Sequence, residues 1–226
     1  MRRREFADRL VSVFFPQRCV LCGEVVAYDD FACESCAFES ADTSDCGHLV
    51  GRVLAGVTAV AAYSGEPARL VRELKRRPDK RIAGFFCERL ERRIRGIGWR
   101  PQLIVPVPSN PKRLRERGFN QAELLAEDLS ARLEIPVCGD MLARRDDSLD
   151  QRGLSDRERL QNALRSFSLQ RPDMAACREI LLVDDVLTTG STAAACAGCL
   201  LEGGAAAVFM AAATHTVHRE NSRPDA

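Results

Sequence analysis

A short apolar run that ends in two acids and a hydroxyl-rich turn constrains the fold of this chain more than any other feature. Residues 180–183 are apolar, and Asp184 and Asp185 follow them directly. The turn behind the acids places four hydroxyl side chains around one glycine: Thr188, Thr189, Gly190, Ser191 and Thr192. The pattern predicts a buried strand, a turn and a helix over 192–202. Because ligands of open α/β sheets bind at the carboxyl ends of strands, we expect a ligand site at this turn.

The turn and the acid pair suit two different parts of one ligand. Backbone amides at a helix N-terminus, with Gly190 allowing close approach, favour a phosphate group. Asp184 and Asp185 would repel that phosphate, and they suit vicinal ribose hydroxyls or a hydrated divalent cation. No lysine follows Gly190, which excludes a Walker A loop. The alternative is an ordinary buried strand that ends in a polar turn and binds nothing.

The remaining patterns alternate between strand and helix. Strands are expected at 56–63, 103–108, 135–138 and 206–214, and helices at 66–76, 81–95 and after a capping Asn120. This alternation predicts an α/β domain with a mostly parallel sheet flanked by helices. The predicted organisation is an N-terminal helix and a cysteine-rich zinc-binding module over 1–50, the α/β domain over 51–216 and a disordered tail over 217–226.

Charge and hydropathy limit where the chain acts. Lys and Arg total 33 against 32 acidic residues, so the net charge of +1 predicts no bulk attraction to nucleic acid or membranes. The longest uncharged apolar run, 205–213, is far shorter than the roughly 18 residues of a membrane span. The N-terminal apolar stretch is too short for a signal peptide, so we expect no membrane insertion and a cytoplasmic protein.

Four of the ten cysteines have the spacing of a metal site. Cys19, Cys22, Cys33 and Cys36 form CxxC-x10-CxxC, which predicts two knuckles that hold one tetrahedral zinc ion. Zinc binding can supply folding free energy of order 10 kcal/mol to a head too small for its own core. The alternative is a set of reduced, unligated thiols. A third CxxC pair, Cys196 and Cys199, falls in an alanine-rich helical pattern and is expected in the core.

Two basic segments stand out locally. Four of the six residues in 112–117 are basic, directly after a predicted strand. Residues 69–81 carry seven bases and two acids, a local net charge of +5. Apolar positions at helical spacing favour a solvated helix face for 69–81, and a nucleic-acid surface is the alternative.

Three segments together resemble a known family. Residues 181–193, LLVDDVLTTGSTA, resemble the phosphoribosyl-pyrophosphate (PRPP) signature of type I phosphoribosyltransferases. Residues 105–126 and 151–167 resemble two further signatures of the ComF family, which is named for competence and DNA uptake. The resemblance implies a type I phosphoribosyltransferase-like fold with a small N-terminal zinc-ribbon-like module.

The same resemblance implies roles for individual residues. Asp184 and Asp185 would hold the ribose hydroxyls and Mg²⁺ of PRPP, and residues 188–192 would hold its 5′-phosphate. The basic segment 112–117 would form a pyrophosphate-binding loop. Lys75, in the other basic segment, matches a lysine typical of the family. The other implied binding residues lie in or just before residues 112–117: Ser109, Asn110, Arg113 and Arg117.

The sequence also departs from the family pattern at two places. Asp146 and Asp147 stand where relatives carry Thr and a basic residue in a mobile loop. Thr43 replaces the first cysteine of a third knuckle, so Cys46 or His48 could displace one of the four predicted zinc ligands.

Two functions remain open from the sequence. The first is an enzyme that transfers a phosphoribosyl group from Mg-PRPP to an unidentified nitrogenous base and releases pyrophosphate. The second is a non-catalytic PRPP-binding or single-stranded-DNA-handling factor, with DNA-uptake proteins as partners. No recognisable base pocket identifies the acceptor.

Overall fold

The computed structural model describes residues 16–27, 30–36, 53–145 and 166–216. Several sequence-based expectations therefore lie outside the described residues. These are the predicted disordered tail, the Asp146–Asp147 departure, most of the third signature, and Cys46 and His48. The division into a module, a domain and a tail stays a prediction.

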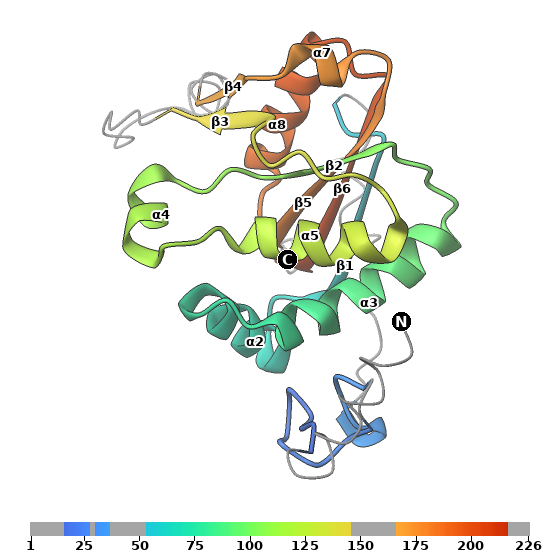
Figure 1. Cartoon of the computed structure of the whole chain (residues 1–226), viewed down its shortest axis with the longest axis vertical. Coiled ribbons are helices and arrows are strands. Elements are labelled where there is room, and N and C mark those ends of the chain that lie inside the picture. Colours follow the sequence, from blue (N-terminus) through green and yellow to red (C-terminus); the bar gives the residue numbers. More distant parts are fainter. Residues whose placement is uncertain (1–15, 28–29, 37–52, 146–165, 217–226) are drawn as a thin grey trace, which may run out of the picture.

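A four-stranded parallel sheet forms the centre of the described structure (Figure 1). Its strands, in spatial order, are β1 (Gly56–Ala62), β6 (Ala207–His215), β5 (Glu179–Leu187) and β2 (Leu103–Pro106). Every neighbouring pair in this sheet is parallel. A separate antiparallel pair joins β3 (Leu142–Arg144) to β4 (Phe167–Leu169). The α/β fold with a mostly parallel sheet is confirmed.

Helices cover both faces of the sheet, as a fully buried parallel sheet requires. One face packs against α2 (Gly65–Arg76), α3 (Lys80–Gly96) and α5 (Gln121–Leu133). The other face packs against α7 (Pro172–Ala175), α8 (Ser191–Glu202) and the β3–β4 pair. Along β5 the side chains alternate between the two layers: Leu181 and Val183 belong to the first core, and Ile180 and Leu182 to the second.

The observed elements agree with most of the predicted ones and differ at two. Residues 135–138 do not form a strand: Val137 makes only an isolated bridge with Ile104. The basic segment 112–117 was expected to be a loop, but it forms a short helix, α4 (Pro111–Arg117). Asn110 caps it by accepting a hydrogen bond from the amide of Lys112 at 2.9 Å, and Gly118 ends it at φ 78°. This helix projects from the body of the domain and buries none of its residues (Figure 1).

Small residues let α8 pack closely on the sheet. Cys196 is fully buried in this layer, as expected, while Cys199 is only half-buried. Burial raises the pKa of the Cys196 thiol well above its ordinary value, which keeps it protonated. None of the described helices combines the length and the apolar character of a membrane span.

Candidate functional site

The carboxyl ends of all four parallel strands contribute to one cavity of about 330 Å³. Residues that follow each strand line it: Tyr63 after β1, Val107 after β2, Thr188 after β5 and Thr216 after β6. Parallel sheets bind ligands at this end of their strands. The cavity therefore lies where the sequence predicted a site.

Nine of the residues singled out in the sequence line this cavity. They are Lys75, Ser109, Asn110, Arg113, Arg117, Asp184, Asp185, Thr188 and Thr192. The other three, Thr189, Gly190 and Ser191, complete the turn between Thr188 and Thr192 without lining the cavity. The structure thus gathers side chains from separate segments of the chain.

The two acids lie on opposite faces of the sheet, because successive strand residues point in opposite directions. Asp185 faces α2 and α5: its Oδ2 lies 2.9 Å from Lys75 Nζ and accepts a hydrogen bond from Gln121 Nε2 at 3.4 Å. Asp184 faces α8, where its charge contributes to the raised pKa of Cys196. Asp184 Oδ1 also accepts a hydrogen bond from the backbone amide of Asp185 at 2.8 Å.

The acid pair carries more negative charge than its surroundings offset. Desolvation raises the pKa of Asp184 well above its ordinary 3.8, and the nearby charge of Asp185 raises it further. Lys75 supplies one positive charge next to Asp185. A ligand that brings hydroxyl donors or a hydrated cation would relieve the remaining repulsion. The oxygen donors present here are the type that Mg²⁺ prefers.

The hydroxyl turn leads directly into α8. Gly190 is the N-cap residue and adopts φ 74°, a left-handed conformation that favours glycine. Glycine has no side chain to cap the helix, and the Ser191 amide makes only a long hydrogen bond, to Thr189 Oγ1 at 3.4 Å. The first turn of α8 can therefore still present backbone amides to an anion. Thr189 and Ser191 bond to each other, with their hydroxyl oxygens 2.9 Å apart.

Two of the four basic residues of α4, Arg113 and Arg117, line the cavity. Arg113 is exposed and Arg117 is half-buried, so both guanidinium groups can meet a solvated anion. Asn110 also lines the cavity, but its side-chain oxygen already caps α4. Ser109 donates to Asn120 Oδ1 at 2.8 Å, which fixes the loop between β2 and α5.

Several cavity residues escaped the sequence analysis. Tyr63, Gln121, Arg144 and Thr216 line the cavity, although none was singled out as a site residue; Gln121 lies within the signature at 105–126. Asn120 was predicted only as a helix cap; it does cap α5 and also lines the cavity. Their position at the carboxyl ends of predicted strands was the signal that could have identified Tyr63 and Thr216.

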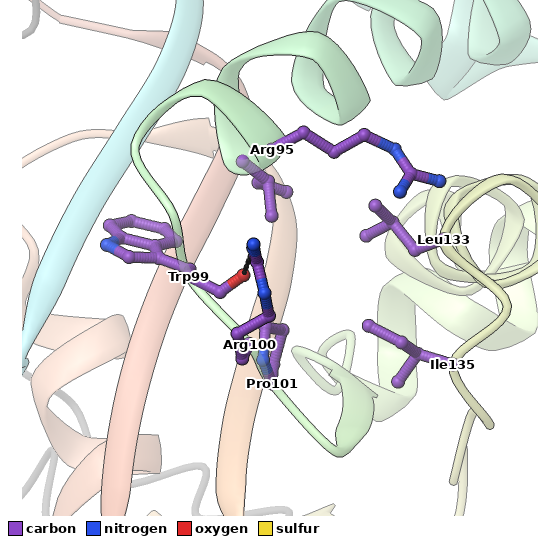
Figure 2. Close-up of a pocket in the computed structure, with 7 residues that line it drawn as sticks. Arg95, Trp99, Arg100, Pro101, Leu133 and Ile135 are labelled. Atoms are coloured by element: carbon purple, nitrogen blue, oxygen red, sulfur yellow. Dashed lines mark hydrogen bonds between the residues drawn. The ribbon is translucent and has the colours of Figure 1, made fainter.

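A larger hollow of about 620 Å³ lies at the opposite end of the sheet, ahead of β2 (Figure 2). Trp99, Arg100 and Pro101 form one side, with Leu133 and Ile135 across from them. Its lining includes no acidic and no hydroxyl side chain among the described residues. This hollow therefore lacks the groups that the predicted sugar-phosphate site needs.

The four predicted zinc ligands converge in the N-terminal head. The sulfur atoms of Cys19, Cys22, Cys33 and Cys36 all lie within 4.8 Å of one another. The first knuckle is closed by backbone hydrogen bonds from Gly23 to Cys19, at 3.0 Å, and from Cys19 to Glu24, at 2.7 Å. The second ends in the 3-10 turn η1 (Glu34–Cys36). Four thiolates at this spacing fit tetrahedral zinc.

Because the four thiols lie close together, the pKa values of Cys19 and Cys36 differ widely. Burial opposes ionisation of Cys19, but hydrogen bonds from backbone amides lower its pKa to about 6. Hydrogen bonding with the sulfur atoms of Cys22 and then Cys33 raises the pKa of Cys36 to about 12. Four neighbouring thiolates cannot all be ionised without a cation among them, so the cluster suits a divalent metal ion.

The head, of which the structure describes residues 16–27 and 30–36, docks on α2 and α3. Two arginines of the basic segment 69–81 make the contacts. Arg69 donates to the carbonyl oxygens of Val20 and Leu21 at 3.2 and 3.0 Å. Arg81 donates to those of Arg18 and Asp30 at 2.8 and 3.0 Å, and also bonds to the side chain of Gln17.

These contacts change the interpretation of residues 69–81. Arg69 and Arg81 hold the head, and Lys75 pairs with Asp185, so three of the seven bases bond to groups in other segments of the chain. The exposed Arg76 and Arg77 remain at the surface, each with an ion pair to Glu73. Residues 69–81 therefore also provide a docking surface inside the molecule, a role that neither sequence interpretation included.

Comparison with curated proteins identifies the relatives of this chain. It is 32% identical over 199 residues to the DNA utilization protein YhgH of Escherichia coli K12, covering 84% of this chain and 86% of that protein. It is 44% identical over 93 residues to Competence protein F of Haemophilus influenzae, 41% of each chain. The chain belongs to the ComF family. Another ComF protein, Competence protein ComFC of Bacillus subtilis, is 35% identical over 106 residues, which are 46% of this chain and 40% of that one.

Among solved structures, the similar chains include phosphoribosyltransferases. One is a glutamine PRPP amidotransferase from B. subtilis, with 14% identity and a TM-score of 0.41 over 58% of this chain and 26% of that one. Another is a hypoxanthine phosphoribosyltransferase from Staphylococcus aureus, with 12% identity and a TM-score of 0.38 over 65% of this chain and 70% of that one. No family model matches the chain.

Proposed function

We propose that the cavity at the carboxyl end of the sheet binds Mg-PRPP. The acid pair would hold the ribose diol and the cation, the 188–192 turn would hold the 5′-phosphate, and Arg113 and Arg117 would hold the pyrophosphate. The observation that carries this proposal is the convergence of nine sequence-predicted residues on one cavity. Membership of the ComF family, with its PRPP signature at 181–193, agrees with it.

We further propose that the bound PRPP reacts with a nitrogenous base. The nitrogen–anomeric-carbon bond forms, the bond from that carbon to pyrophosphate breaks, and pyrophosphate leaves with the electron pair. The nitrogen loses its proton to solvent. Arg113 and Arg117 would stabilise the charge that develops on the leaving group, and Asp185 with Asp184 would fix the sugar. Mg²⁺, when bound, would supply further charge stabilisation.

Calorimetry on an Asp185→Asn variant tests the binding site. Loss of the carboxylate charge should weaken Mg-PRPP binding about tenfold or more, since hydrogen bonds to charged groups contribute about 1.5–3 kcal/mol. Asp173→Asn is the matched control, because Asp173 is exposed in α7 and lies outside the cavity. Equal affinity of wild type and Asp185→Asn would remove the basis of the proposal.

Pyrophosphate release separates catalysis from binding alone. Wild-type protein with Mg-PRPP and a panel of purine and pyrimidine bases should release pyrophosphate with at least one of them. Tight PRPP binding without turnover on any base would instead favour the non-catalytic alternative.

A second candidate function is the handling of single-stranded DNA, supported by relatives named for competence and DNA utilization. Four bases of residues 69–81 are exposed and could meet a phosphate backbone: Arg72, Arg76, Arg77 and Lys80. The side chains of Arg76 and Arg77 are 78% and 67% exposed. Binding should weaken steeply with salt and in the Arg76→Glu, Arg77→Glu variant. Salt-independent binding, or none, would argue against this function.

A further inference from the structure

One buried side chain in the cavity has an unmet hydrogen-bonding group. Gln121 is the first residue of α5 and is only 5% exposed. Its Nε2 donates to Asp185 Oδ2 at 3.4 Å. Its Oε1 is buried and has no hydrogen-bond partner within the part of the chain that the structure describes. Gln121 also lines the cavity.

The charge of Asp185 determines which way the amide points. A carboxylate accepts hydrogen bonds and donates none, so Gln121 must present its NH₂ group to Asp185. Turning the amide over would place two acceptor oxygens against each other. The oxygen is therefore the group left over, and a buried acceptor without a donor is unfavourable.

The neighbouring amide shows that helix capping does not explain Gln121. Asn120 is the residue that caps α5, since its Oδ1 accepts hydrogen bonds from the amide of Ala122 at 3.2 Å and from the hydroxyl of Ser109 at 2.8 Å. Asn120 Nδ2 donates to the carbonyl of Val107 at 3.1 Å. Both ends of the Asn120 amide are satisfied inside the protein, whereas Gln121 keeps one acceptor unused beside Asp185.

We propose that Gln121 Oε1 accepts a hydrogen bond from a ribose hydroxyl of the bound sugar phosphate and so helps the cavity distinguish ribose from deoxyribose. This assignment rests on the proposed function. An ionised phosphate cannot satisfy Oε1 because it offers no donor, whereas a sugar hydroxyl can donate to Oε1 and accept from neighbouring donors. Sites that hydrogen-bond a substrate hydroxyl discriminate strongly against analogues without it, because the protein group is then left unpaired.

The test compares ribose 5-phosphate with its 2-deoxy and 3-deoxy analogues by calorimetry, in wild type and in Gln121→Met. Methionine keeps the length of the side chain but has no amide oxygen. Wild type should bind ribose 5-phosphate about tenfold more tightly than one of the two analogues. In Gln121→Met that preference should fall at least threefold, while a general loosening of the cavity would weaken all three ligands alike.

Gln170→Met is the matched control, because Gln170 is exposed, its side chain bonds only to Ser168 among the described contacts, and it lies outside the cavity. It should keep the wild-type preference. An unchanged preference in Gln121→Met would overturn the assignment to Gln121 and leave the proposed function standing. If wild type binds neither PRPP nor ribose 5-phosphate, the assignment to Gln121 and the proposed function are both overturned. Wild type that binds all three sugars equally would overturn the assignment without any variant.

Discussion

Replacing Gly84 by alanine should release the N-terminal head even though alanine favours helices. Gly84 lies within α3, directly beneath the ring of Phe31 from the head. A Cβ atom at this position would lie 2.5 Å from Phe31 Cζ and 2.6 Å from Cε1. Real side chains do not approach this closely, so the ring must move off the helix.

Two opposing contributions decide the result. Alanine stabilises a helix interior by about 1 kcal/mol relative to glycine. Displacing the half-buried Phe31 ring costs about 1 kcal/mol of burial, roughly half the value of a fully buried aromatic side chain. The ring also loses cation–π contacts with Arg81 and Arg132, now 5.8 and 5.6 Å from its centre, each worth about 0.5 kcal/mol at exposed sites. Docking of the head should weaken by about 2 kcal/mol, roughly thirtyfold in its opening equilibrium.

Amide hydrogen exchange, followed by mass spectrometry on peptides from 16–36, measures the docking directly. Exchange in this region should accelerate in Gly84→Ala, while the urea midpoint of the α/β domain stays equal or rises. Gly96→Ala is the control on the same helix, because no atom lies within 4 Å of a Cβ built there. If peptides from 16–36 exchange their amide hydrogens equally slowly in the two variants, the contact between Phe31 and Gly84 does not hold the head.

Three further predictions concern the acid pair and the cysteine cluster. Because the pKa of Asp184 is raised in the folded protein, its contribution to stability is present below its ordinary pKa of 3.8 and is lost as pH rises toward the raised value. In urea unfolding without ligand from pH 4 upward, the free energy of unfolding should fall less steeply with pH in Asp184→Asn than in wild type. An equal dependence on pH in the two proteins would count against this cause. In the head, a Cys19→Ser, Cys22→Ser double variant should lose stoichiometric zinc by elemental analysis, and retained metal would refute the ligand set. Zinc affinity of wild type should fall with decreasing pH, since the Cys36 proton must be displaced.

The sequence predicted those parts of the site that depend on local patterns. The apolar run, the acids and the glycine turn determine a strand, its carboxyl end and a helix N-terminus, so β5 and α8 were predicted almost residue by residue. The signals for α4 were also present, since Asn110, Pro111 and Gly118 are typical of a helix start and end. The analogy with a pyrophosphate loop outweighed them.

Contacts between distant segments could not be predicted in the same way. Arg69 and Arg81 bond to carbonyl oxygens about 50 or more residues earlier in the chain, and any residue type provides a carbonyl oxygen. No side-chain pattern marks such a partner. The burial of Gln121 likewise depends on how α5 packs beside Asp185 and not on its neighbours in sequence.

Helix α2 connects the cysteine cluster of the head to the cavity at the carboxyl ends of the strands. It presents Arg69 to the knuckle that carries Cys19 and, six residues later, Lys75 to Asp185. Six helical residues rise about 9 Å, so a tilt of this rod at one end displaces the other. A chimaera that received its head from a distant homologue would therefore have to preserve the seating of α2, or the lysine would no longer reach its carboxylate.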